Sequence, residues 1–134
     1  MVFKYVKPIE SIECIQLFES KMNFQFPDSF RLMVKEYNGG RPEKRTFDTR
    51  AVQGRELKTF LSFNENDTEN IWSINQYQDE IFRDKYIAFA IDHFGNLICF
   101  EKTGATIVFF DHEIENVEYI AENFDAFIDA LKSQ

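Results

Sequence analysis

Three apolar runs separated by short polar turns dominate the C-terminal half of the chain. The runs cover residues 86–92, 97–102 and 106–111 and are rich in Phe and Ile. The intervening segments, 93–96 and 103–105, each contain a glycine and are typical of tight turns. Strands joined by turns this short run antiparallel, so the sequence predicts a meander. Because the runs are apolar on both faces, we expect helices on one side of this sheet and a loop or a partner on the other.

Amphipathic segments with helical spacing precede and follow these runs. Residues 9–22 carry an apolar stripe at three- and four-residue steps, made of Ile12, Ile15, Phe18 and Met22. A second helix is predicted over 28–37, because Pro27 fits a first helical turn. A third is predicted over 70–82, and Asn123 is expected to cap a last helix whose buried stripe is Phe124, Phe127, Ile128 and Leu131.

The remaining segments are less regular. Residues 41–58 contain six cations and are predicted to be a loop with one short strand near 45–50. Such a basic loop could bind phosphate or RNA, but a solvated loop is the commoner outcome at this length. Short strands are also expected at 60–63 and 117–121. Together these elements predict an α+β fold in a single domain, 1–134, with a largely antiparallel or mixed sheet and helices packed beside it.

Size and charge exclude several classes of protein. A chain of 134 residues with 44% apolar content can bury a core without a metal or disulfide. It has no run of about 20 apolar residues and no signal-peptide pattern, so we expect a cytoplasmic protein without a membrane partner. The net charge is −8, and residues 68–134 hold 4 cations against 13 acids. This balance argues against nucleic acid as a partner.

The sequence offers little catalytic chemistry. It lacks the motifs of serine hydrolases, phosphate-binding loops and zinc helices, so we expect neither an enzyme nor a cofactor. Cys14 and Cys99 are far apart and are expected to be small buried side chains in the reduced state. Two Asp-His pairs, at 92–93 and 111–112, follow strands whose ends share one edge of a meander. A metal or acid-base site there is the less favoured alternative to turn caps, and no metal site is predicted.

Acidic residues are concentrated near the C-terminus. Seven acids and no Lys or Arg occur within 111–129. An uninterrupted acidic run repels itself, whereas it would attract a basic protein surface. A surface that only maintains solubility is the alternative. On the binding interpretation, the candidate partner-binding residues are Asp92, Asp111, His112, Glu113, Glu115, Glu118 and Glu122.

Four motifs in order resemble those of the SUKH superfamily, which includes the yeast Smi/Knr cell-wall regulator domain and many bacterial toxin-immunity proteins. The first is Phe-Pro-Asp-Ser-Phe at 26–30, followed by Tyr-Asn-Gly-Gly-Arg-Pro at 37–42. The others are a strand–Gly-Asn–strand hairpin at 89–100, Val-Phe-Phe-Asp-His-Glu at 108–113, and a closing helix start at 120–127. Phe110 stands where Trp is usual, and Asn123 where Ser is usual. The motif residues with structural roles are Pro27, Tyr37, Asn38, Gly39, Gly40, Gly95, Asn96 and Phe124.

The resemblance implies an α+β domain that works by binding rather than by catalysis. It suggests an immunity protein that neutralises a cognate toxin, of which nucleases with basic surfaces are one type. A regulatory or scaffold domain of the cell-wall-regulator type is the alternative. We also expect Gly39 or Gly40 to adopt a positive φ after the second helix, because glycine carries no Cβ.

Overall fold

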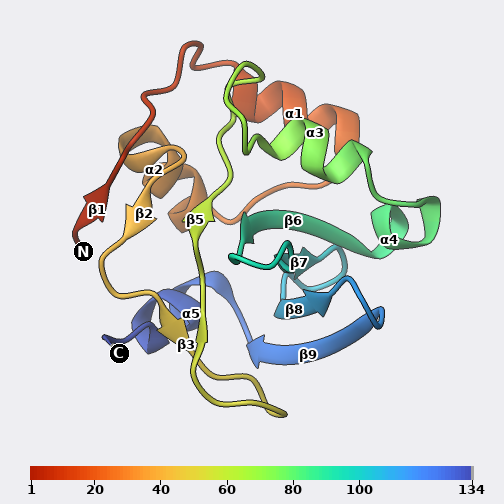
Figure 1. Cartoon of the computed structure of the whole chain (residues 1–134). Helices are drawn as coiled ribbons and strands as arrows, with labels where there is room; N and C mark the ends of the chain where they lie inside the picture. Colours follow the sequence, from red (N-terminus) through yellow and green to blue (C-terminus); the bar gives the residue numbers. More distant parts are fainter. Residues whose placement is uncertain (134) are drawn as a thin grey trace.

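The computed structural model describes residues 1–133, which form helices beside antiparallel sheets (Figure 1). The helices are α1 (Cys14–Met22), α2 (Asp28–Tyr37), α3 (Ile71–Gln76), α4 (Glu80–Lys85) and α5 (Phe124–Ala130). The strands are β1 (Phe3–Lys4), β2 (Arg41–Pro42), β3 (Thr46–Phe47), β4 (Arg55–Glu56), β5 (Thr59–Phe60), β6 (Tyr86–Ile91), β7 (Leu97–Glu101), β8 (Ile107–Asp111) and β9 (Asn116–Ala121). This architecture confirms the predicted α+β class.

The main sheet has five antiparallel strands in the order β5-β6-β7-β8-β9. Its last four strands follow one another in the chain, so the predicted meander is confirmed. The β6–β7 register shifts between Ala88 and Ala90. There the side chain of Asn75, on α3, replaces a strand partner: its Nδ2 donates to the Ala88 carbonyl at 3.0 Å, and its Oδ1 accepts from the Ala88 N–H at 2.8 Å. The buried Asn75 amide thereby satisfies both backbone groups of Ala88.

Phenylalanine side chains fill the core between the sheet and the helices. Phe30 of α2 lies 5.6 Å from Phe89 and 5.3 Å from Phe100 between ring centroids, both in edge-to-face geometry. Phe124 of α5 completes the group at 5.2 Å from Phe30. Edge-to-face packing of this kind is favourable beyond simple burial because ring edges and faces carry opposite partial charge. The many Phe residues of the sequence are therefore mainly core residues.

Helix α4 covers part of the other face of the sheet. Successive strand residues point to opposite faces, so Phe109 and Phe110 of β8 lie on different sides. Phe109 packs towards Phe47, whereas Phe110 contacts Phe82 of α4 at a centroid distance of 4.9 Å. The sequence predicts helices on one side of the sheet and a loop or a partner on the other. This prediction is wrong, because helices pack against both faces.

Two predicted helices differ from those observed. Helix α1 begins at Cys14 rather than Ile9, and Ile12, placed in the buried stripe, is exposed. The predicted helix at 70–82 is two helices, because Asp79 accepts a hydrogen bond from the Phe82 N–H and starts α4. As a result Tyr77, which follows Ile71 and Ile74 at helical spacing, lies in the connection and is 91% exposed.

The remaining predicted helices and strands lie closer to the elements that the structure shows. Helix α2 spans the predicted residues, although Pro27 occupies the N-cap position rather than the first turn. Asn123 caps α5 as expected, accepting from the Ala126 N–H at 2.8 Å. Residues 41–58 contain three short strands rather than one, and the strand predicted at 60–63 is β5, at 59–60. None of the helices within 1–133 has the length and apolar character needed to cross a membrane.

Candidate functional site

The two turns at one end of the meander form a common surface, which we call the turn edge and define as residues 92–96 and 111–115. Leu97 of β7 pairs with Ile91 on one side and with Phe110 on the other. The end of β6 and the end of β8 therefore lie at the same edge of the sheet, on either side of the start of β7, as the sequence predicts. The alternation of strand direction brings together residues that the chain separates widely.

Asp92 holds the first turn in place. One carboxylate oxygen accepts from the N–H groups of Phe94 and Asn96, at 2.9 and 2.8 Å, and the other accepts from the Asn96 side chain at 3.0 Å. Gly95, with a φ of +85°, supplies the left-handed conformation that this turn needs. Asp92 is buried, so its carboxylate serves the turn and does not face a partner.

Asn96 joins the first turn to the second. Its Oδ1 accepts from the His112 N–H at 3.1 Å and lies 2.7 Å from the ring nitrogen Nδ1. Because the Asn96 amide nitrogen donates to Asp92, the oxygen is the atom that faces His112, and Nδ1 must carry a proton. The Asp92–Asn96–His112 chain of hydrogen bonds thus fixes both turns relative to each other.

Exposed apolar side chains stand on these two fixed turns. Phe94 is 79% exposed and Ile114 is 70% exposed, although both are large and apolar. Around Ile114 the acids Glu113 and Glu115 are exposed, and Asp111 is half-buried. Exposed apolar side chains that are surrounded by charged residues and stand on well-fixed turns are typical of protein-binding surfaces. The sequence analysis placed Phe94 in the turn at 93–96 but named neither Phe94 nor Ile114 as a candidate residue; their position among polar residues was the available signal.

A hollow of about 340 Å³ adjoins the turn edge, between α4 and the second face of the sheet. Its walls include Ile81, Phe82, Phe110, Val117, His112 and Glu115. Tyr86 also lines it, and burial, followed by the charge of Glu101, raises the pKa of the phenol, which stays a neutral donor. The surface therefore combines projecting side chains with a concave part.

Glu118 differs from its expected place in the acidic patch. Its side chain is 8% exposed and points away from the turn edge towards β4, where Arg55 binds it. Burial alone would raise the pKa of this carboxyl, but hydrogen bonds from Arg55 and Thr49 outweigh burial and hold the pKa below its ordinary value. Glu118 is consequently a structural ion-pair partner. Glu122 is exposed beyond the end of β9.

The alternative metal or acid-base site involves Asp92, His93, Asp111 and His112. His93 is exposed, while the Asp92 carboxylate is occupied by the turn. Within residues 1–133, no three His, Cys, Asp or Glu side chains are grouped as a metal ion would require. Cys99 is buried and Cys14 half-buried, both as free thiols, and burial raises the pKa of each.

The motif residues around α2 form a second hydrogen-bonded centre. Asn38 is buried, and its Nδ2 donates to the Lys7 carbonyl at 2.7 Å and to the Ser62 hydroxyl at 3.0 Å. Its Oδ1 accepts from the Phe63 N–H at 2.9 Å. Tyr37 stacks on Phe3 at 4.4 Å between centroids. Gly39 has a φ of +65°, which confirms the expectation, while Gly40 lies against the Tyr37 carbonyl.

The fold defines the chain as an α+β domain built on a five-stranded antiparallel sheet. The chain belongs to the SMI1 / KNR4 family (SUKH-1), whose family model matches residues 10–130. This match covers every element from α1 to α5. None of the curated proteins shows significant sequence similarity to the chain.

Proposed function

We propose that the protein is a non-catalytic binding domain that acts as an immunity protein, neutralising a cognate toxin through the turn edge. Membership of the SMI1 / KNR4 family supports a binding role, since the resemblance already implied one. The observation that carries the proposal is the pair of exposed apolar residues, Phe94 and Ile114, on turns fixed by the Asn96–His112 hydrogen bonds.

The charge around these anchors selects the kind of partner. Asp111, Glu113 and Glu115 surround Ile114 within a segment that lacks Lys and Arg. A toxin that acts on nucleic acid has a basic surface, and an acidic edge would attract that surface and mask it. Charges at the rim raise the association rate, while the desolvated Phe94 and Ile114 would slow dissociation. The negative charge of the turn edge therefore favours a basic toxin domain as the partner.

The test first searches the reading frames beside the gene of this chain for one that encodes a toxin domain, and that domain is then the candidate partner. The two proteins are co-expressed, protection of the cell is scored, and the affinity is measured by titration calorimetry at low and high salt. We expect a one-to-one complex. Phe94→Asp with Ile114→Asp should weaken it at least 100-fold, and Glu113→Lys with Glu115→Lys should weaken it and reduce its salt dependence.

The control pair is Glu10→Lys with Glu65→Lys, which makes the same charge change at exposed positions outside the turn edge. Glu118 is left intact because its replacement would disturb the fold. If the turn-edge variants fold and still bind and protect like the control pair, the turn edge is not the interface. A stable complex with a housekeeping protein and none with the toxin would instead support the regulatory or scaffold role.

A further inference from the structure

A groove lies between α2 and α5, on the side of the molecule where β1 and the chain ends are found (Figure 1). It has a volume of about 290 Å³. Leu32 and Met33 line it from α2, Ile128 lines it from α5, and Phe3, stacked on Tyr37, lines it from β1. Leu32 is 64% exposed, so much of this apolar lining is open to solvent.

The groove continues past Ile128. A second hollow, of about 600 Å³, shares Met1, Ile128 and Asp129 with the first. It is also lined by Val2, Leu131, Glu43 and Lys44. The two hollows form one elongated apolar surface. An elongated groove between helices suits a segment of polypeptide better than a compact small molecule.

The rim of the first hollow is acidic. Glu36 from α2 and Asp125 and Asp129 from α5 line the first hollow, and all three are exposed. No Lys or Arg of the described chain lines this hollow, and within residues 1–133 none of the three acids is in an ion pair. The first hollow therefore presents negative charge from both α2 and α5 beside its apolar floor, whereas Lys44 lines the second hollow.

We propose that this groove binds an amphipathic helix of a partner protein whose apolar face is flanked by Lys or Arg. In the helix-in-groove mode, apolar residues at three- and four-residue spacing contact the floor while flanking cations meet the rim. A second copy of this chain would place Glu36 and Asp129 against the same acids, which is repulsive. An anionic lipid surface is disfavoured for the same reason.

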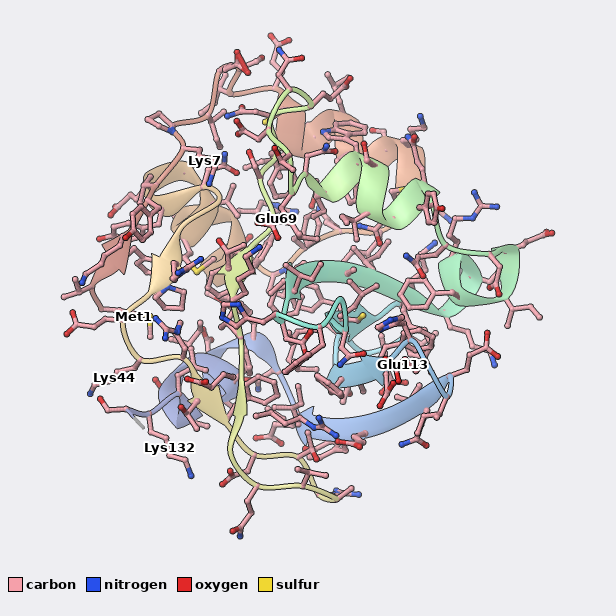
Figure 2. All side chains as sticks on the ribbon, in the orientation of Figure 1. Met1, Lys7, Lys44, Glu69, Glu113 and Lys132 are labelled. Atoms are coloured by element: carbon pink, nitrogen blue, oxygen red, sulfur yellow. The ribbon has the colours of Figure 1, made fainter. Side chains whose placement is uncertain are left out.

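This surface is separate from the turn edge. Figure 2 shows Met1, at the groove, and Glu113, at the turn edge, on opposite sides of the view. The proposal therefore goes beyond the proposed function and stands on a different set of residues. A protein with both surfaces can hold two polypeptides at once.

The test uses a synthetic probe. A labelled 18-residue helical peptide with Leu on one face and Lys along its flanks is titrated at physiological salt, and binding is followed by fluorescence anisotropy and by amide chemical shifts. We expect saturable binding with shifts confined to α2, α5 and β1. A scrambled peptide of identical composition should bind at least tenfold more weakly, and a peptide with Glu in place of Lys should not bind.

Two sets of variants locate the site. Leu32→Asp, at an exposed position, and Glu36→Lys with Asp129→Lys should each weaken binding at least tenfold. Glu36 and Asp129 lie near the C-terminal ends of their helices, where a cation is tolerated well. The control, Glu113→Lys with Glu115→Lys at the turn edge, should stay within twofold. The proposal would be overturned if the peptide showed no saturable binding, or if the scrambled peptide bound equally well. Chemical-shift changes outside the groove, or an equal loss of affinity in the control variant, would overturn it as well.

Discussion

Arg55 binds both carboxylate oxygens of Glu118, with Nε 3.0 Å from Oε1 and Nη2 2.9 Å from Oε2. The guanidinium carbon of Arg55 also lies 4.0 Å from the centroid of the Phe109 ring, which it covers. Thr49 donates to the same carboxylate at 2.7 Å. This arrangement fastens the 48–56 segment, including β4, to the outer strand of the meander. A bidentate pair on an aromatic surface is among the stronger ionic contacts that proteins make.

Glu118→Gln is expected to lower stability in a pH-dependent way. The pKa of Glu118 in the folded protein lies below its ordinary value of 4.5. Between these two pKa values the unfolded chain therefore binds more protons than the folded protein, and acid favours unfolding. The stabilisation is present above pH 4.5 and is lost towards the folded pKa. Urea unfolding at pH 7 should show a loss of about 1–3 kcal/mol in the variant. At pH 3 the difference in unfolding free energy between the two proteins should be smaller. A difference that does not change with pH would contradict the ion-pair role.

Gly39→Ala and Gly40→Ala should both lower the melting temperature, for different reasons. A Cβ on Gly39 costs about 1–2 kcal/mol in the left-handed conformation and would lie 3.3 Å from Ser62 Cβ. A Cβ on Gly40 would lie 2.8 Å from the Tyr37 carbonyl oxygen, so the backbone must shift. Gly54→Ala is the matched control, with a φ of +78° and nothing within 4 Å. A loss at Gly39 equal to that at Gly54, together with no loss at Gly40, would show that close packing plays no part.

Asn38→Ala should destabilise the protein by about 2–4 kcal/mol, because buried donors and acceptors lose their partners. The N–H of Phe63 and the carbonyl of Lys7 both bond to this side chain. Chemical denaturation of the variant against Asn66→Ala, at an exposed position, measures the effect. A loss no larger than that of the Asn66 variant would mean that water replaces the lost bonds at no cost.

His112 should have its proton on Nδ1 when the ring is neutral. The oxygen of Asn96, 2.7 Å away, can only accept, so the tautomer follows from the hydrogen bond. Nitrogen chemical shifts of the imidazole distinguish the two tautomers directly. In Asn96→Ala the ring should lose this preference, while His93, which is exposed, should be unchanged in both proteins. A neutral ring protonated on Nε2 in the unmodified protein would rule out the bridge between the turns.

The meander and α2 were predictable from sequence because their signals are local. The apolar runs at 86–111 and their glycine turns define strand and turn within a few residues, and Pro27 with Asn38 brackets α2. The prediction of a single helix over 70–82 was wrong for a physical reason. Ile71, Ile74, Tyr77 and Ile81 keep helical spacing, but the cap formed by Asp79 restarts the helix and leaves Ile81 exposed.

Parts of the candidate site depend on contacts between distant segments and were not predictable. Glu118 has no sequence feature that sets it apart from Glu113 or Glu122, and its partner Arg55 lies in a loop that appeared merely basic. The Asn96–His112 bridge likewise requires knowledge of the register. The sequence predicted that the two Asp-His pairs share an edge, yet it could not show that one carboxylate is used within its own turn.

The meander also fixes the order in which the protein can become functional during synthesis. Phe30 emerges from the ribosome early, but its ring partners Phe89, Phe100 and Phe124 belong to the last strands and α5. At roughly 5–20 residues per second, the nascent helices wait on the order of several seconds with an uncovered aromatic face. We therefore expect released fragments that end at Asp111 to be protease-sensitive, and released chains that continue through Lys132 to resist digestion. The turn edge, assembled from these late strands, would exist only on a finished molecule, so unfinished chains would not compete with it for a partner.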